Sequence, residues 1–286
     1  MATEVTLKEF NMNQVGSDKI IVIIGKRNTG KTVLVKDYLY HNRDIPFCTC
    51  ISPTESLNSS FSDIIPHKFI FTEYNPKVVK AFYDRQYKLT KKIIKAQNGH
   101  GDPEYLKVDN RGLLLMDDCL ADSKQWKNDD TIRKIFMNGR HAGITYILTM
   151  QHLLGITPEL RENIDYIFIL KQPKRLEQEK IWKHYAGMFP DFNMFSQIFN
   201  KVTEDRGIMV IDNTTTSAEL EDQVYWYKAK IRTGYRVCCP EFWIDNEKYA
   251  DSDSDDDGQN VLHKVAQTTR NKQQYDVKII PSARSD

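Results

Sequence analysis

Residues 19–32 constrain the fold of this chain more than any other segment. The apolar run 19–24 predicts a buried strand, and the stretch GKRNTGKT follows it directly at 25–32. A helical pattern begins at Val33. This order of strand, glycine-containing loop and helix matches GxxxxGK[ST], a pattern in which the loop backbone folds around a phosphate group. The sequence therefore predicts a phosphate-binding loop at the end of a buried strand.

The chemistry of such a loop explains the residue types found in it. Glycines allow positive φ angles and close approach, so that backbone N–H groups can surround a phosphate, and the start of the helix adds partial positive charge. We expect Lys31 to bridge β- and γ-phosphates and the Thr32 hydroxyl to bind Mg²⁺. The predicted nucleotide-binding residues are those of the loop and the first residue of the helical pattern: Gly25, Lys26, Arg27, Asn28, Thr29, Gly30, Lys31, Thr32 and Val33.

A second motif is an apolar strand that ends in two carboxylates, LLLMDD at 113–118. Asp117, at the strand tip, is expected to hold Mg²⁺ through water, and Asp118 is expected to polarise the water that attacks the γ-phosphate. The next strand ends at Gln151, which places a neutral amide at the carboxyl edge of the sheet, where ligands of open α/β sheets bind. We predict that Gln151 contacts the γ-phosphate.

Short β-type runs alternate with longer helical patterns along most of the chain, which is typical of a parallel sheet covered by helices. The other β-type runs are 47–51, 68–71, 112–116, 144–149, 166–170, 207–211 and an alternating run at 223–230; the helical patterns are 32–40, 76–97, 129–138 and 175–184. Because two runs separate the phosphate loop from the acidic strand along the chain, we expect an inserted strand between them in the sheet. The predicted fold is a three-layer α/β P-loop NTPase of the additional-strand, RecA-like type, with a mostly parallel central sheet, helices on both faces and an antiparallel or edge strand at the end.

Composition excludes several classes of protein. The chain has 286 residues with 40 Lys and Arg against 39 Asp and Glu, and it contains no run of about 18 apolar residues, so no membrane span is expected. The first residues lack the apolar segment of a secretory signal, and five clustered cysteines do not suggest a disulfide framework. We therefore expect an intracellular protein that is not secreted.

Three parts of the chain differ in composition. We predict an N-terminal extension at 1–17, a P-loop ATPase domain at 18–249 and an acidic tail at 250–286, in which residues 251–257 include five Asp. Such a tail cannot bury enough apolar surface to offset the cost of ordering, so it is expected to be mostly disordered.

Basic residues recur at helical spacing within 76–97. Lys88, Lys91, Lys92 and Lys95 are three or four residues apart and predict a basic stripe on one helix face. Such a stripe is either a solvated face or a surface for DNA phosphates. A second cluster, Lys171, Lys174 and Arg175, leaves the same two possibilities open.

Together these motifs resemble those of the genome-packaging ATPases of large nucleocytoplasmic DNA viruses, a branch of the FtsK/HerA class of DNA pumps. The segments GKRNTGKT, LLLMDD, NGRHAGIT at 138–145 and TMQ at 149–151 occur in the order and spacing of that family, and the resemblance spans about 18–212. It implies a homo-oligomeric ring, commonly hexameric, that hydrolyses ATP with Mg²⁺ at subunit interfaces and passes double-stranded DNA through its centre. It also implies a capsid or portal component as partner, and a location in the virion and in the viral factory of the host cytoplasm.

In that family an arginine from a neighbouring subunit contacts the γ-phosphate. Arg140 is the first candidate, because it precedes the strand that carries Gln151, and Arg161 is the second. One position departs from the wider class, where many members have Glu after the metal-binding Asp. Here Asp118 is shorter by one methylene, so another side chain is needed if its reach is too short.

Two other functions are compatible with a phosphate-binding loop. One is a nucleotide-binding virion assembly protein without turnover, which would fit if Asp118 cannot activate water. The other is a P-loop nucleoside kinase, although the CxxC zinc ribbon usual in viral thymidine kinases is missing. A GTPase is disfavoured because no [NT]KxD segment follows the run at 166–170.

Overall fold

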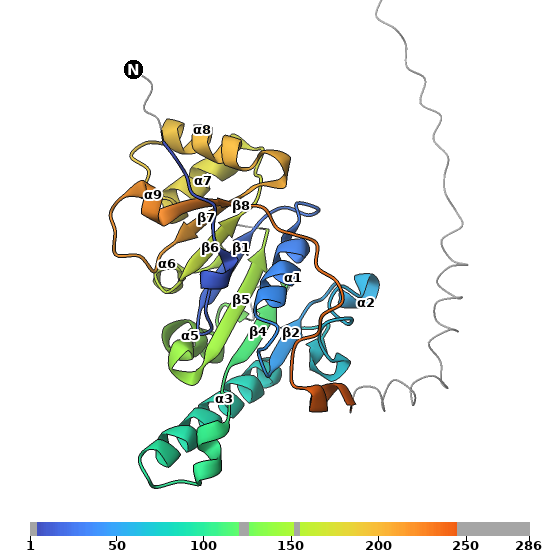
Figure 1. Cartoon of the computed structure of the whole chain (residues 1–286). Helices are drawn as coiled ribbons and strands as arrows, with labels where there is room; N and C mark the ends of the chain where they lie inside the picture. The colour runs from blue at the N-terminus through green and yellow to red at the C-terminus, as the bar shows by residue number, and fades with distance from the viewer. Residues whose placement is uncertain (1–4, 120–125, 152–154, 245–286) are drawn as a thin grey trace, which may run out of the picture. The chain divides into compact units, whose positions relative to one another are not determined.

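An eight-stranded sheet organises the chain, with the strand order β3-β2-β4-β5-β1-β6-β7-β8 (Figure 1). This computed structural model describes residues 5–119, 126–151 and 155–244. The strands are β1 (Ile20–Ile24), β2 (Cys48–Ile51), β3 (Ile70–Phe71), β4 (Gly112–Met116), β5 (Ile144–Met150), β6 (Tyr166–Ile169), β7 (Ile208–Asp212) and β8 (Val224–Tyr227). Neighbouring strands from β3 to β6 in this order pair in parallel. Strand β7 pairs antiparallel with β6 on one side and with β8 on the other. The predicted mostly parallel sheet with an antiparallel strand at its edge is confirmed.

Four long helices coincide closely with the helical patterns in the sequence. They are α1 (Lys31–His41), α3 (Pro76–Gln97), α5 (Asp130–Asn138) and α7 (Arg175–Tyr185). A further long helix, α8 (Phe192–Val202), was not predicted; Asp191 caps it by accepting a hydrogen bond from the Met194 N–H at 2.9 Å. Shorter elements are α2 (Glu55–Asn58), α6 (Pro158–Arg161), α9 (Leu220–Gln223) and the 3₁₀ turns η1 (Met12–Gln14), η2 (His67–Phe69), η3 (Pro103–Lys107), η4 (Gly139–Ala142) and η6 (Glu204–Arg206).

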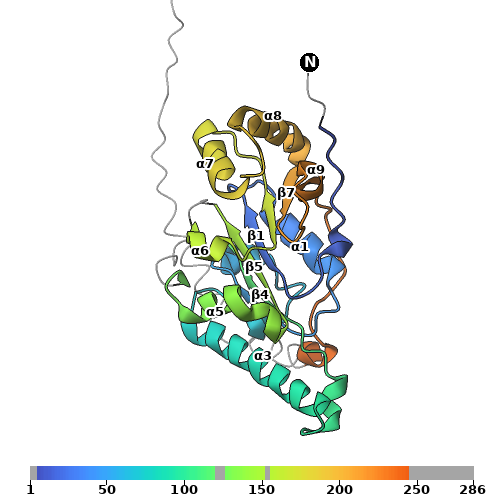
Figure 2. The same ribbon diagram turned by 90° about the vertical axis from the view of Figure 1, so that its left-hand side faces the viewer.

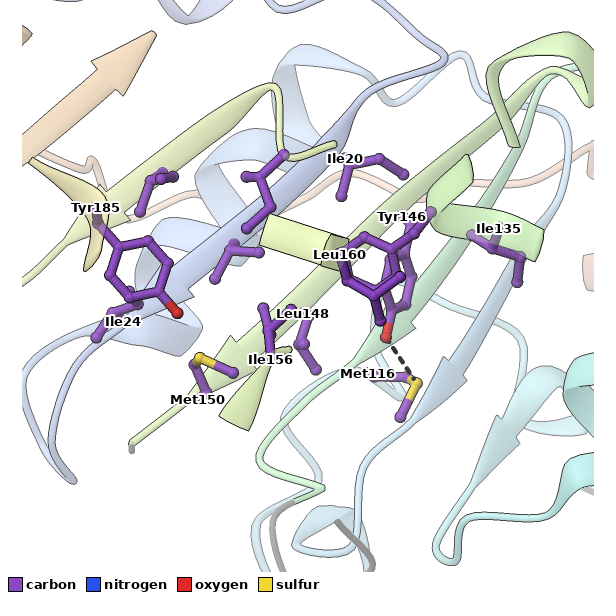
Figure 3. Packing of buried hydrophobic residues seen from close by; sticks show 14 of the residues in the cluster. Ile20, Ile24, Met116, Ile135, Tyr146, Leu148, Met150, Ile156, Leu160 and Tyr185 are labelled. Atoms are coloured by element: carbon purple, nitrogen blue, oxygen red, sulfur yellow. Dashed lines mark hydrogen bonds between the residues drawn. The ribbon is translucent and has the colours of Figure 1, made fainter. Parts of the chain in front are cut away.

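Both faces of the sheet are covered by helices. Successive residues of a strand point to opposite faces, so Ile20, Val22 and Ile24 of β1 join one apolar cluster while Ile21 and Ile23 join the other. Helix α1 packs on the second cluster, and α3, α5, α6, α7 and α8 pack on the first (Figure 2). Figure 3 shows part of the first cluster, where Leu148 and Met150 of β5 lie with Ile156 and Leu160. The predicted three-layer α/β fold is therefore confirmed.

The strand inserted between the phosphate-loop strand and the acidic strand is β5. It pairs with β1, where Ile24 is opposite Met150, and with β4, where Met116 is opposite Leu148. The two runs that intervene along the chain form β2 and β3, which lie beyond β4. Because these central strands are parallel, their carboxyl ends meet at one edge of the sheet. The order of the strands thus brings the phosphate loop, the two acids and Gln151 to the same edge.

Helix α3 and the turn η3 form an arm that extends away from the sheet (Figures 1 and 2). The turn folds back on the helix, with the Lys92 ammonium donating to the Tyr105 hydroxyl at 2.7 Å and the His100 N–H donating to the Lys95 carbonyl at 2.9 Å. We call residues 76–109 the α3 arm.

The predicted tail at 250–286 lies outside the described residues, as do residues 1–4 of the predicted extension. The described part of that extension packs beside the sheet: Phe10 is buried, and its N–H donates to the Trp226 carbonyl at 2.8 Å. Within the described ranges no helix is both long and apolar enough to cross a bilayer.

A buried carboxylate ties α1 to the segment that follows β8. The Asp37 side chain is fully buried and accepts hydrogen bonds from the Tyr227 hydroxyl at 2.6 Å, the Lys230 N–H at 2.9 Å and the Arg232 Nε at 2.7 Å. Helix α1 starts inside the phosphate loop, and these bonds hold its second half against the segment that follows β8.

Replacing Arg232 by Met should lower the free energy of unfolding by about 2 to 4 kcal/mol, because the fully buried Asp37 side chain would lose its bond to the guanidinium. The lower half of that range is expected, since the Arg232 side chain is 22% exposed and water can approach it. Urea unfolding measures the effect. The control is Lys201→Met, in an exposed ion pair with Glu204. Equal stability of the two variants would contradict a structural role for the Asp37 cluster.

Candidate nucleotide-binding site

The phosphate loop closes tightly between β1 and α1. Asn28 and Gly30 have positive φ angles of 61° and 104°. A Cβ added at Gly25 would lie 2.6 Å from the Thr29 Oγ1, which itself donates to the Lys26 carbonyl at 2.7 Å. The backbone can turn in this way only because glycine stands at positions 25 and 30. The predicted strand, loop and helix are therefore present with the backbone that a phosphate cradle requires.

Lys31 lies inside the loop as the first residue of α1. Its side chain is buried, and its ammonium donates to the carbonyl of Gly25 at 2.9 Å and to that of Lys26 at 3.1 Å. Burial lowers the pKa of Lys31, while the charges of Asp118 and Asp117 raise it in part. The loop that carries Lys31 follows β1 and the two acids follow β4, and because these strands are parallel in one sheet, the lysine and the acids lie at the same edge.

Asp117 follows β4 and is held by hydroxyl groups from the strands on either side. The Thr149 Oγ1 of β5 donates to the Asp117 Oδ1 at 2.7 Å, and the Ser52 Oγ, just after β2, approaches the Oδ2 at 3.5 Å. Burial raises the pKa of Asp117, and the Thr149 hydrogen bond and the Lys31 charge counteract it. A buried acid that keeps these partners is suited to holding a cation.

Asp118 has the left-handed backbone conformation, with φ of 52°. Its N–H donates to the Thr149 Oγ1 at 3.0 Å, and its Oδ2 accepts a hydrogen bond from the Gln151 amide. Its Oδ1 is buried and has no hydrogen-bond partner. Buried polar atoms are nearly always satisfied. The Asp118 Oδ1 therefore marks a place where a water or a ligand group would complete the site.

These residues fit a magnesium nucleotide. The loop provides a turned backbone and a buried ammonium, and Thr32 in the first turn of α1 provides a hydroxyl. Together with Asp117 this is an oxygen-donor set of the kind Mg²⁺ prefers, with waters and phosphate oxygens as the remaining ligands. Thr32 and Asp117 would hold the metal, and residues 25–33 would hold the phosphates.

Two residues of this site, Ser52 and Thr149, were not predicted from the sequence. Both follow or end apolar strands, and both lie next to Asp117 because Ile51, Met116 and Leu148 are aligned across β2, β4 and β5. A hydroxyl residue at the end of a buried strand was the available signal. Its meaning depended on knowing which strands are neighbours.

The two candidate arginines lie in different places. Arg140 is exposed in η4, which precedes β5, so it lies toward the amino end of that strand and not at the edge with the phosphate loop. Arg161 ends α6, and its guanidinium lies over the Tyr185 ring at 5.6 Å, with its Nη1 buried and without a hydrogen-bond partner. The catalytic roles of both arginines stay predictions.

The four predicted DNA-contacting lysines are all exposed on α3. Lys91 lies over the Tyr87 ring at 4.4 Å, and Lys92 bonds Tyr105. The second cluster, Lys171, Lys174 and Arg175, is also exposed and follows Leu170, whose side chain lies against Gly25 of the phosphate loop. The arm is thus a basic surface remote from the loop, and the second cluster is a basic surface beside it.

Comparison with known proteins finds similar chains among viruses. No family model matches the chain. It is 40% identical over 226 residues to the uncharacterized protein L437 of Acanthamoeba polyphaga mimivirus, covering 79% of this chain and 78% of that one.

Among solved structures, the pCW3 conjugation coupling protein TcpA with ATPγS has a TM-score of 0.52 at 13% identity and covers 78% of this chain and 62% of TcpA. The genome packaging NTPase B204 of Sulfolobus turreted icosahedral virus 2, in complex with ATPγS, has a TM-score of 0.46 at 16% identity and covers 76% of this chain and 100% of B204. The likeness to TcpA is one of fold.

Proposed function

Because the chain belongs to the same protein family as L437 of Acanthamoeba polyphaga mimivirus and has the fold of P-loop NTPases, we propose that it is an ATP-hydrolysing motor that moves double-stranded viral DNA into the capsid. One observation carries the enzymatic part of the proposal. The buried Lys31 ammonium lies in the loop after β1, at the sheet edge where Asp117 and Asp118 follow β4. This is the arrangement that phosphoryl transfer requires, because the phosphates need a cradle, a cation and a group that orients water.

Each residue has a distinct task in this proposal. Bound Mg·ATP supplies the transferable phosphoryl group and the metal charge that neutralises it. Residues 25–33 bind the phosphates through the backbone, with Lys31 as their cation. Thr32 and Asp117 hold the metal. Asp118 accepts a hydrogen bond from the attacking water and thereby orients and polarises it.

Gln151 offers a way to compensate for the short side chain of Asp118. Its amide already bonds the Asp118 Oδ2, so the amide and the unpartnered Asp118 Oδ1 lie side by side. A water between them could be held by both residues, with the amide also free to contact the γ-phosphate. We therefore assign Asp118 and Gln151 to one water-positioning pair.

We propose that copies of the chain form a ring, which is hexameric as in the family that the sequence resembles. Two neighbouring copies contribute residues to each nucleotide site of this ring. The exposure of Arg140 supports this, because its guanidinium is available to another copy and lies away from the phosphate loop of its own chain. A capsid or portal component would bind such a ring, in the viral factory and in the virion.

Contact with DNA is assigned to the α3 arm. The helix carries seven basic residues and one acid, Asp84, and it extends away from the sheet (Figures 1 and 2). Lys88, Lys91, Lys92 and Lys95 are exposed along one face of it. A projecting basic helix can reach the phosphates of a duplex that passes through a ring, which a lysine on the flat surface of the body could not do as easily.

The test of the proposed function is steady-state phosphate release from ATP with and without duplex DNA. We expect slow release by the protein alone and faster release with DNA. Absence of phosphate release under both conditions, despite nucleotide binding, would instead favour the virion assembly protein. Transfer of phosphate to a nucleoside would favour the kinase.

Replacing Lys88, Lys91, Lys92 and Lys95 by Gln should weaken duplex binding and reduce its dependence on salt. For every DNA phosphate that is no longer neutralised by a lysine, the slope of log affinity against log salt should fall by about 0.9. Fluorescence anisotropy over a range of salt concentrations measures this. The matched control changes four exposed lysines outside the α3 arm, Lys8, Lys183, Lys201 and Lys228, with the same loss of charge. Equal slopes for both quadruple variants would argue against the arm as the DNA surface.

A further inference from the structure

We propose that Thr149 is the positioning residue that holds both acids of the site and couples them to Gln151. The inference rests on the proposed function, since it concerns the same site. Thr149 is 1% exposed and is the last residue but one of β5, the strand inserted between the phosphate-loop strand and the acidic strand.

The Thr149 hydroxyl bonds both acids at once. It accepts a hydrogen bond from the Asp118 N–H at 3.0 Å and lies 2.7 Å from the Asp117 Oδ1. A hydroxyl has one proton, and an N–H can only donate. A lone pair of the hydroxyl oxygen accepts the Asp118 N–H, and the one Thr149 proton is donated to the Asp117 Oδ1. This fixes the rotation of the Asp117 carboxylate and directs its other oxygen away from Thr149.

The same hydroxyl also supports an unfavourable backbone. Asp118 has φ of 52°, a conformation that a residue with a side chain rarely adopts. The bond from its N–H to Thr149 stabilises this turn, and the turn aims the Asp118 side chain at Gln151. Thr149 thus determines the direction of the metal-binding acid through its side chain and of the water-orienting acid through its backbone.

These two hydrogen bonds join β5 to both acids that follow β4, the metal-binding Asp117 and the water-orienting Asp118. Gln151 lies two residues after Thr149 and holds the Asp118 Oδ2. The end of β5 therefore contacts both acids that follow β4, Asp117 through Thr149, and Asp118 through Thr149 and Gln151.

Valine at position 149 is the sharpest test, because it keeps the branched shape and removes the hydroxyl. The Asp117 Oδ1 and the Asp118 N–H would then lose their partner. Loss of a group that orients a metal ligand typically costs about 10- to 100-fold in metal affinity or activity. We expect Thr149→Val to raise the Mg²⁺ concentration for half-maximal binding of a fluorescent ATP analogue about tenfold and to lower kcat about 100-fold. Binding of the analogue in EDTA should stay within about twofold, because the loop is unchanged.

Two variants separate positioning from packing. Thr149→Ser retains the hydroxyl and should restore most of the Mg²⁺ dependence. Thr145→Val is the matched control: Thr145 is also 1% exposed on β5, and its hydroxyl also accepts a backbone N–H, that of Asp18 at 3.0 Å, but at the opposite end of the strand. It should leave the Mg²⁺ dependence as in the unaltered protein. If Thr149→Val fails to fold, Thr149→Ala is measured in its place, because alanine also removes the hydroxyl and has a smaller side chain than valine.

The inference is overturned if Thr149→Val and Thr145→Val have the same Mg²⁺ dependence, or if Thr149→Ser behaves as Thr149→Val. These outcomes are distinct from failure of the proposed function. An unaltered protein that releases no phosphate would reject the motor, while the Mg²⁺ dependence of nucleotide binding would still decide the role of Thr149.

Discussion

Replacing Lys31 by Ala is expected to lower the rate of phosphate release by about 100- to 1,000-fold, the loss typical when one charge-stabilising group is removed from a reaction centre. The ammonium is held inside the loop by the Gly25 and Lys26 carbonyls, and the loop lies at the sheet edge where the acids follow β4. Because the ammonium already lies inside the loop, its contribution is lost with the side chain. Phosphate release at saturating ATP measures kcat.

The fold should tolerate this change. Burial lowers the pKa of Lys31, which means that the protein without ligand carries a cost for the buried charge, and alanine removes that cost. The midpoint of thermal unfolding should therefore stay the same or rise. Lys36→Ala is the matched control on the same helix, where the lysine pairs with Asp63 at 3.4 Å. A Lys31→Ala protein that hydrolyses ATP as fast as the Lys36→Ala protein would reject the assigned site.

Local patterns in the sequence predicted the elements well. The helical pattern at 76–97 and the apolar run at 112–116 coincide with α3 and β4. Such elements can be predicted locally, because the apolar periodicity and the Asn, Pro and Gly residues that begin or end the element lie within a few residues of one another. Helix α8 had a comparable signal in Asp191 and in Phe195 and Phe199 four residues apart, and it was missed.

The arrangement of the strands was harder to derive. The sequence indicated that something separates the phosphate-loop strand from the acidic strand, but the runs that intervene along the chain are not those that intervene in the sheet. Strand β5 takes the position between them although it follows β4. Pairing between distant strands leaves no local pattern, so Ser52 and Thr149 could not be assigned to the site. Lys31, Asp117 and Asp118 could be assigned to it, because each stands at a motif position that indicates its role.

Replacing Arg140 by Ala is expected to lower phosphate release by about 1,000-fold or more, as loss of an arginine finger does. We expect this arginine to act on another copy and not on its own chain. Seven residues of β5 separate η4 from the edge with the phosphate loop, a span of about 23 Å at 3.3 Å per residue. An exposed side chain at that distance cannot reach the phosphates bound by its own chain, whereas it can contact those of a neighbour in a ring.

Mixing two inactive proteins tests this directly. Arg140→Ala subunits retain Lys31, and Lys31→Ala subunits retain Arg140, so an interface between them can combine an intact loop with an intact arginine. Phosphate release from the mixture should exceed the sum of the separate proteins, and Arg133→Ala, in an exposed pair with Glu159, should remain active by itself. No gain on mixing would contradict a shared site, provided that sizing shows mixed assemblies. A gain obtained with Arg161→Ala instead would assign the role to Arg161, which would then have to leave its place over Tyr185 to reach the neighbour.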